Sequence, residues 1–208
     1  LFVATKKQAK GLVAEAAETL NMPYITERWP GGLLTNFATI RKSIKKMQII
    51  DKMKEDGTFD TLSKRERLQI NRQREKLDLN LGSIVKMTRM PEAVFIIDTN
   101  KEDIALAEAN KLGIRSFAMN DTNTNPSQVS FPIPANDDAS KSIECILSIV
   151  SKAIAEGLAE RDADQDKKAE EKKEKAKQIA EEIEQIASDQ NKKSDEKKGR
   201  AKKRIKEK

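Results

Sequence analysis

Short apolar segments alternate with amphipathic helical segments over most of this 208-residue chain. Five segments are rich in β-branched and aromatic residues but too short for helices: 1–5, 23–26, 93–98, 114–119 and 131–134. Apolar residues at helical spacing follow the first of them and recur in 104–112 and 137–158. Nearly continuous apolar strands separated by helices are typical of parallel sheets that are covered on both faces. The sequence therefore predicts an α/β domain of the Rossmann-like type.

A different pattern interrupts this alternation between residues 36 and 82. Apolar residues recur there as narrow stripes at helical spacing: Phe37, Ile40, Ile44 and Met47, then Ile70, Leu77, Leu81 and Ile84. Asp56-Gly57 should end the first helix, and Ser63 with Glu66 at the capping-box spacing should begin the second. The sequence predicts an antiparallel helical hairpin, a coiled-coil arm inserted into the sheet domain. A bend, or a second contact near the tip, would explain three apolar residues that lie off the first stripe: Ile49, Ile50 and Met53.

Charge is unevenly distributed along the chain. Residues 41–76 carry twelve Lys or Arg against six Asp or Glu, whereas residues 77–160 carry seven against twelve. From residue 161 the chain is rich in Lys and Glu; we expect a partly formed helix over 161–191, and a basic segment over 192–208 that is disordered until it meets a polyanion. The predicted domains are the sheet domain, the arm and a charged C-terminal tail: 1–35 with 83–160, 36–82, and 161–208.

A glycine pair, Gly31-Gly32, lies in the sequence RWPGGLLTN just before the basic segment. Glycine lets the main chain bend and approach another backbone closely, and Thr35 or Asn36 can cap the next helix, whose free amides favour anions. Either the pair only turns the chain, or it belongs to a polyanion site together with Arg28 and the basic residues that follow. A basic segment can equally be a solvated surface, so charge alone leaves both interpretations open.

Catalytic groups are sparse in this sequence. The chain has no His, so its single Cys, Cys145, has no partner for a nucleophilic pair and none for an internal disulfide. Asp98 and Asp121 follow predicted strands, where open α/β sheets bind ligands, but such residues also satisfy nearby amides in turns. Residues 136–139 (NDDA) fit a helix N-terminus in the same way. No glycine-rich nucleotide motif occurs, and residues 4–7 (ATKK) are only a weak phosphate-loop candidate.

We therefore expect a protein without catalytic residues, metal, cofactor or small-molecule substrate. The sequence also contains no run of about 18 apolar residues, which is the length needed to span a membrane. With one Cys and no such run, the sequence predicts an intracellular protein with no membrane partner.

Seven motifs occur in an order and at spacings typical of one family: LFVATKKQA, RWPGGLLTNFATIRKSIKKM, DGTF, PEAVFIID, EANKLGI, DTNTNP and IPANDDA. Over residues 1–158 the chain resembles bacterial small-subunit ribosomal protein two, the S-two family. The resemblance implies a flavodoxin-like domain whose turn from Trp29 to Asn36 roots the arm, on the solvent side of the cytoplasmic small subunit where head meets body. It also implies contact with small-subunit rRNA and neighbouring small-subunit proteins, help in retaining the large messenger-binding protein, and no enzymatic activity.

The chain departs from the family pattern at four positions. Ala4, Ser83 and Ala135 stand where Gly is usual, and Arg115 stands where Pro usually follows LGI. These differences alter loops more than the plan of the fold. The chain also opens inside its first predicted strand, so we expect the family's amino-terminal portion, with its RNA-contacting end, to precede it.

The leading hypothesis is a structural rRNA-binding protein with little base specificity. Its candidate RNA-binding residues lie in the turn and on the arm: Arg28, Trp29, Gly31, Gly32, Thr35, Asn36, Arg41, Lys42, Lys45, Lys46, Arg65, Arg72, Arg74 and Lys76. One rival is an α/β enzyme for a nucleotide or sugar phosphate that uses Asp98 or Asp121 and dimerises through the arm. The other is a protein-docking module, in which three apolar residues matter more than the lysines: Ile49, Ile50 and Met53.

Overall fold

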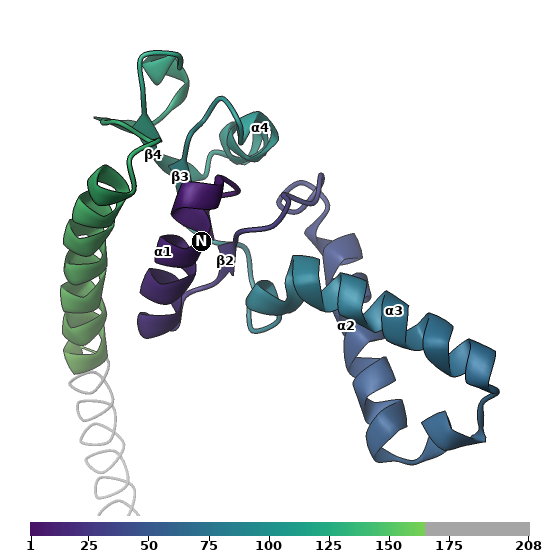
Figure 1. Ribbon diagram of the computed structural model, residues 1–208. Helices are drawn as coiled ribbons and strands as arrows, with labels where there is room; N and C mark the ends of the chain where they lie inside the picture. Colours follow the sequence, from purple (N-terminus) through teal and green to yellow (C-terminus); the bar gives the residue numbers. More distant parts are fainter. Residues whose placement is uncertain (165–208) are drawn as a thin grey trace, which may run out of the picture. The chain divides into compact units, whose positions relative to one another are not determined.

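The computed structural model describes residues 1–164 (Figure 1). The chain divides into two units, one of Leu1–Ile154 and one that begins at Ala155. Of the predicted tail, residues 161–164 are helical, and the rest of the expectations for 161–191 and 192–208 lie outside the described residues. The domain boundaries drawn from the sequence stay a prediction.

A five-stranded sheet lies at the centre of the first unit, in the order β2-β1-β3-β4-β5. Its strands are β1 (Phe2–Val3), β2 (Tyr24–Ile25), β3 (Ala93–Ile97), β4 (Arg115–Asn120) and β5 (Phe131–Pro134). Every neighbouring pair is parallel, which confirms the predicted α/β class. The strand order is the one found in flavodoxin-like doubly wound sheets.

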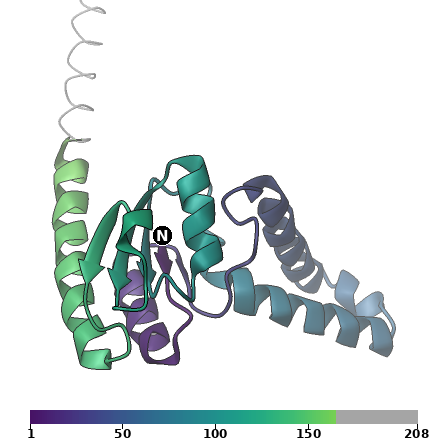
Figure 2. The same ribbon diagram turned by 90° about the horizontal axis from the view of Figure 1, so that it is seen from above.

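Both faces of this sheet are covered by helices: α1 (Lys7–Thr19), α4 (Asp103–Leu112) and residues 140–154 of the last helix. Side chains alternate between the faces along each strand, so neighbouring residues join different cores. Phe2 and Phe95 pack with α1 and the last helix, whereas Val3 and Ile96 pack with α4. Figure 2 shows α4 on the side of the sheet opposite α1. The nearly continuous apolar strands are thus explained, because both of their faces are buried.

The chain between β2 and β3 forms a helical insertion, residues 37–84. It consists of α2 (Phe37–Glu55), η1 (Thr58–Thr61), α3 (Lys64–Leu81) and η2 (Gly82–Ile84). The predicted ends are confirmed: Gly57 has a φ of 73°, and Ser63 and Glu66 form a capping box. The helices α2 and α3 pack against each other. That they form a coiled-coil arm stays a prediction.

The predicted apolar stripes account for most of the buried side chains of the insertion. Ile44 and Leu81 join the core that contains Val3. Ile50, which we expected off the stripe, is instead buried, while Ile49 beside it is 59 % exposed. The reason is that the buried stripe of α2 continues at an interval of three after Met47, which is also buried.

Several predicted boundaries differ from those of the structure, and two of the differences have a clear local cause. The first strand is β1, Phe2–Val3, rather than residues 1–5, since Thr5 already donates to Glu102 of another loop. The last helix begins at residue 140 and not at 137, because residues 137–139 form a turn. Asn136 Oδ1 accepts hydrogen bonds from the amides of Asp138 and Ala139. The residues NDDA therefore form a turn that precedes the helix and leads into it.

Candidate nucleic-acid interface

The glycine turn before α2 surrounds a carboxylate from the same chain. Gly32 has a φ of 84°, a conformation that favours glycine. The Oε1 atom of Glu108 accepts hydrogen bonds from the Trp29 indole Nε1 at 3.1 Å and from the Gly32 amide at 2.7 Å. Its Oε2 atom accepts from the amides of Leu34 at 2.9 Å and Thr35 at 3.0 Å, and from the Thr35 hydroxyl at 3.1 Å. The turn therefore binds an anion that α4 supplies.

Glu108 keeps its charge although it is buried, at 8 % exposure. Within residues 1–164 no basic side chain forms an ion pair with it. Burial alone would raise the pKa of Glu108, but hydrogen bonds from Thr35, Gly32, Trp29 and Leu34 outweigh burial and lower it. Dipoles of the turn thus take the place of a counter-ion.

Sequence reasoning missed Glu108, although a signal was present. Glu108 lies on the face of α4 that also buries Ala105 and Ala109. A carboxylate on an apolar helix face must find donors when it is buried. A preceding Gly-Gly turn with a Trp beside it can supply them, so the two features belong together.

The turn residues proposed for RNA fall into two groups. Trp29 is buried, and the polar donors of Trp29, Gly32 and Thr35 are the ones that contact Glu108. Arg28 and Gly31 are exposed. Asn36 takes the N-cap position of α2, but its side chain makes no capping bond and accepts from the Thr39 hydroxyl instead. The polar donors of the turn are thus directed to Glu108 within the same chain.

Six of the eight basic residues proposed on the insertion have exposed side chains: Lys42, Lys45, Lys46, Arg65, Arg72 and Lys76. Lys42 lies three and four residues before Lys45 and Lys46, so the three share one side of α2. The remaining two make internal contacts. Arg41 donates to the Met87 carbonyl at 3.0 Å. Arg74 pairs with Asp51 of α2 at 2.9 Å and with Asp78 of α3 at 3.0 Å.

The carboxyl ends of β1 and β3, where doubly wound folds bind ligands, also carry internal ion pairs. Lys6 Nζ lies 2.8 Å from a carboxylate oxygen of each of Asp98, Asp137 and Asp138. Burial opposes the charge on Lys6, but these three carboxylates raise its pKa. The Thr5 amide, in the loop after β1, donates a hydrogen bond to Glu102 at 3.0 Å. This amide is therefore already bound to a carboxylate of the same chain.

Asp98 serves as a turn residue, one of the two interpretations that the sequence allowed. It has a φ of 67°, and its Oδ1 accepts hydrogen bonds from the amides of Asn100 and Lys101. Asp121 likewise accepts from the Thr122 amide at 2.6 Å.

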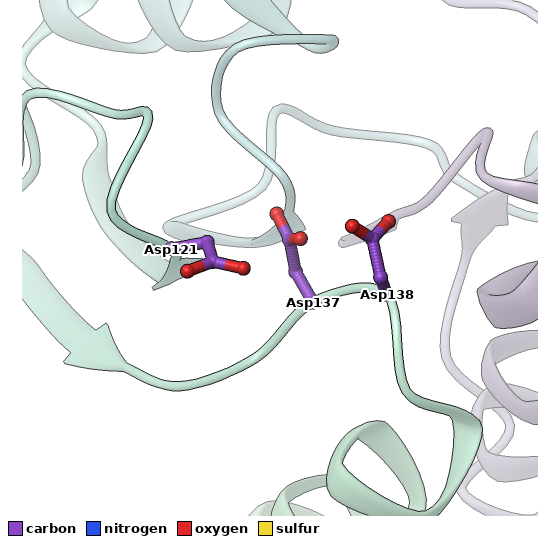
Figure 3. Close-up of side chains that lie close together, drawn as sticks. All are labelled: Asp121, Asp137 and Asp138. Atoms are coloured by element: carbon purple, nitrogen blue, oxygen red, sulfur yellow. The ribbon is translucent and has the colours of Figure 1, made fainter.

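Asp121, Asp137 and Asp138 lie close together beyond the sheet, with carboxylate oxygens within 4.8 Å of one another (Figure 3). By spacing they are the described residues that could contact a cation, although Lys6 already supplies positive charge to two of them. Asp137 is 1 % exposed, and burial is the main reason why its pKa is raised despite Lys6. The sequence did not indicate that these three residues meet, because Asp121 lies far from the others along the chain.

Fold and candidate interface together define a class of protein. It is a doubly wound α/β protein whose helical insertion presents cations and whose strands carry internal ion pairs at their carboxyl ends. The family described as Ribosomal protein S2 matches residues 1–157, so the chain belongs to this family. The resemblance inferred from the sequence motifs is thereby confirmed.

Three curated relatives, each named small ribosomal subunit protein uS2, are similar over 157 residues, or 76 % of this chain. The protein of Flavobacterium johnsoniae is 65 % identical, with 62 % of its length covered. The proteins of Christiangramia forsetii and Parabacteroides distasonis are 64 % and 63 % identical, with 52 % and 56 % covered. The chain thus spans between half and two thirds of the length of these relatives. In residues 1–164, no helix has both the length and the apolar character needed to cross a membrane.

Proposed function

We propose that this chain is a structural component of the small ribosomal subunit in the cytoplasm and takes part in translation without enzymatic activity. Membership of the Ribosomal protein S2 family supports this role. The names of its relatives, small ribosomal subunit protein uS2, agree with it. The sheet domain acts as a platform, and the helical insertion acts as an antiparallel coiled-coil arm that binds small-subunit rRNA at the junction of head and body.

The exposed cations of the insertion are the observation that carries the RNA-binding part of this proposal. Lys42, Lys45 and Lys46 on α2, with Arg65, Arg72 and Lys76 on α3, contact phosphates. Since RNA helices are recognised mainly through shape and backbone, this binding has little base specificity. Arg28 and Gly31 extend the interface toward the turn. The other six proposed residues make contacts within the chain: Arg41, Arg74, Trp29, Gly32, Thr35 and Asn36.

The internal ion pairs at the carboxyl ends of β1 and β3 favour a scaffold over the rival enzyme. A phosphate-binding loop needs free amides or a free cation after the first strand. Here the Thr5 amide contacts Glu102, and Lys6 contacts three carboxylates. Negative side chains at these positions repel a nucleotide or sugar phosphate.

We further propose that the protein contacts neighbouring small-subunit proteins and helps to retain the large messenger-binding protein of the subunit. The three apolar residues considered for protein docking differ in exposure: Ile50 is buried, Met53 is half-buried and Ile49 is exposed. Ile49 is therefore the most accessible of the three to a protein partner on α2.

The test of RNA binding is reversal of three charges. Lys42, Lys45 and Lys46 are changed to Glu together, and affinity for a small-subunit rRNA transcript is measured over a series of salt concentrations. The slope of log affinity against log salt is negative, and each lost phosphate contact should reduce its magnitude by about 0.7 to 0.9. The variant should therefore bind more weakly, with a flatter salt dependence, and co-sediment less with small subunits.

A matched control separates the effect of losing a local interface from the effect of changing the net charge. Lys111, Lys141 and Lys152, exposed residues outside the insertion, are changed to Glu together. This variant has the same net charge but should keep the wild-type salt slope. Equal slopes for the two triple variants would contradict the proposed interface.

A further inference from the structure

We propose that the turn of residues 29–35 is an oxyanion-binding site whose ligand is the chain's own Glu108, and that this contact positions α2 for rRNA. The second half of this inference rests on the proposed function; the first half does not. It makes Glu108 a positioning residue rather than an RNA contact.

The donors of the turn form a built site. Three backbone amides, one indole N–H and one hydroxyl converge on the two oxygens of a single carboxylate, at distances of 2.7 to 3.1 Å. Hydrogen bonds to an ionised acceptor are about twice as strong as those between neutral groups. Glycine at position 32 permits the positive φ that this arrangement requires. The geometry suits a small oxyanion with two oxygens on one side, such as a carboxylate.

The location of the site links it to α2. Thr35, which contributes two donors, lies two residues before the first residue of α2, Phe37. Glu108 belongs to α4, which packs on the sheet. The contact therefore fixes the point where the chain leaves the sheet domain and enters α2. The exit from the insertion is tied separately, since the Ser83 hydroxyl donates to the Tyr24 carbonyl of β2.

Two interpretations of these donors predict opposite effects of removing Glu108. If the turn were an RNA phosphate site that Glu108 competes for, Glu108→Ala would free five donors and remove a negative charge. RNA would then bind more tightly. If Glu108 positions α2, the same change weakens RNA binding although the protein becomes more positive.

The experiment uses the full chain and a small-subunit rRNA transcript. Glu108→Ala is compared with Glu144→Ala, which removes an exposed carboxylate on the last helix and changes net charge by the same amount. We expect Glu144→Ala to bind as tightly as wild type or slightly more tightly. Loss of orientation worth a single charge-assisted hydrogen bond corresponds to about a tenfold loss of affinity, which is the effect expected for Glu108→Ala. Binding by Glu108→Ala that equals or exceeds that of Glu144→Ala would overturn the positioning role.

A second readout tests the anion site without RNA. Trp29 is the only tryptophan of the chain, and its indole N–H is one of the donors, so its fluorescence reports on the site. In Glu108→Ala the emission maximum should move to longer wavelength as water reaches the indole. Sodium acetate should reverse this shift more effectively than sodium chloride at the same ionic strength. Emission identical to wild type, or no difference between the two salts, would overturn the site.

The two halves of the inference can fail separately. If wild type does not bind the transcript, the proposed function fails, while the response of Trp29 to acetate still decides the oxyanion site. If Glu108→Ala does not fold, as judged by circular dichroism, Glu108→Gln is used in its place, because it keeps the shape and removes the charge. Tight RNA binding by a folded Glu108→Gln would count against the positioning role in the same way.

Discussion

Gly31 and Gly32 are neighbours in the sequence, but a side chain would have different consequences at each. Gly32 has a positive φ of 84°, and a Cβ atom there would lie 3.4 Å from the Cβ of Asn36. A Cβ atom at Gly31 would lie more than 4 Å from every heavy atom beyond its chain neighbours, and Gly31 has no positive φ. A left-handed conformation costs a residue with a Cβ about 1–2 kcal/mol, so Gly32→Ala should lower the free energy of unfolding by that amount.

Urea unfolding followed by circular dichroism measures this difference. Gly31→Ala is the control, and its stability should stay within about 0.5 kcal/mol of wild type, as for most surface substitutions. Equal losses in the two variants would show that the turn does not need a glycine at position 32.

At this scale the sequence indicated the turn but not its ligand. The glycine turn and the basic residues could be predicted, because each depends on local chemistry. The cap expected from Thr35 or Asn36 does not form, since the N-cap residue Asn36 makes no side-chain capping bond. The partner of the turn, Glu108, lies 76 residues from Gly32 along the chain. Only the packing of α4 against the segment before α2 brings the two together, and no local pattern contains that information.

Helix α2 carries isoleucines that differ strongly in burial. Ile44 is 1 % exposed and belongs to the core that includes the sheet, whereas Ile49 on the same helix is 59 % exposed. Truncating a buried Ile to Ala removes transfer free energy and leaves a cavity, which together cost about 2–5 kcal/mol. We therefore expect Ile44→Ala to destabilise the protein by about 3 kcal/mol.

Ile49→Ala is the matched control, since it makes the same change in the same helix. Its thermal unfolding midpoint should remain close to that of wild type, while the midpoint of Ile44→Ala falls by several degrees. A large loss for Ile49→Ala and none for Ile44→Ala would mean that α2 buries the opposite face.

The positions and buried faces of helices and strands could be predicted where hydrophobic periodicity and capping residues agreed. They were harder to predict where a tertiary contact determined which residue is buried. The sheet strands and the start of α3 follow from apolar runs and from Ser63 with Glu66. Ile50 was misplaced, because a strict heptad puts Asp51 and not Ile50 at the buried position. In the structure Asp51 instead pairs with Arg74 across the two helices.

For the whole molecule, uneven charge along the sequence becomes two different arrangements in space. The acidic stretch supplies Glu108, Asp98 and Asp137, which are buried and contact donors within the sheet domain. The basic stretch supplies six of the eight proposed cations as exposed side chains on the helical insertion. Burying the carboxylates in this way leaves the cations of the insertion with few internal partners, and this is the physical basis of the proposed RNA contact.

Acid should weaken the whole fold through Glu108. Its pKa is lowered in the folded state, so its contribution to stability is complete above the ordinary glutamate value of 4.5 and is lost as the pH falls through the lower folded value. Glu108→Gln cannot titrate. At neutral pH this variant should be less stable than wild type by about 2–3 kcal/mol, because it loses hydrogen bonds to a charged group.

The difference in unfolding free energy between wild type and Glu108→Gln is the quantity to follow from pH 7 downward, by urea unfolding at each pH. Asp137 and Glu102, whose pKa values are raised mainly by burial, are present in both proteins and cancel in the difference. The gap should therefore shrink as the pH falls below the ordinary value, since protonated Glu108 no longer offers the turn an anion. A gap that stays constant or widens in acid would mean that shape, and not charge, is what the turn recognises in Glu108.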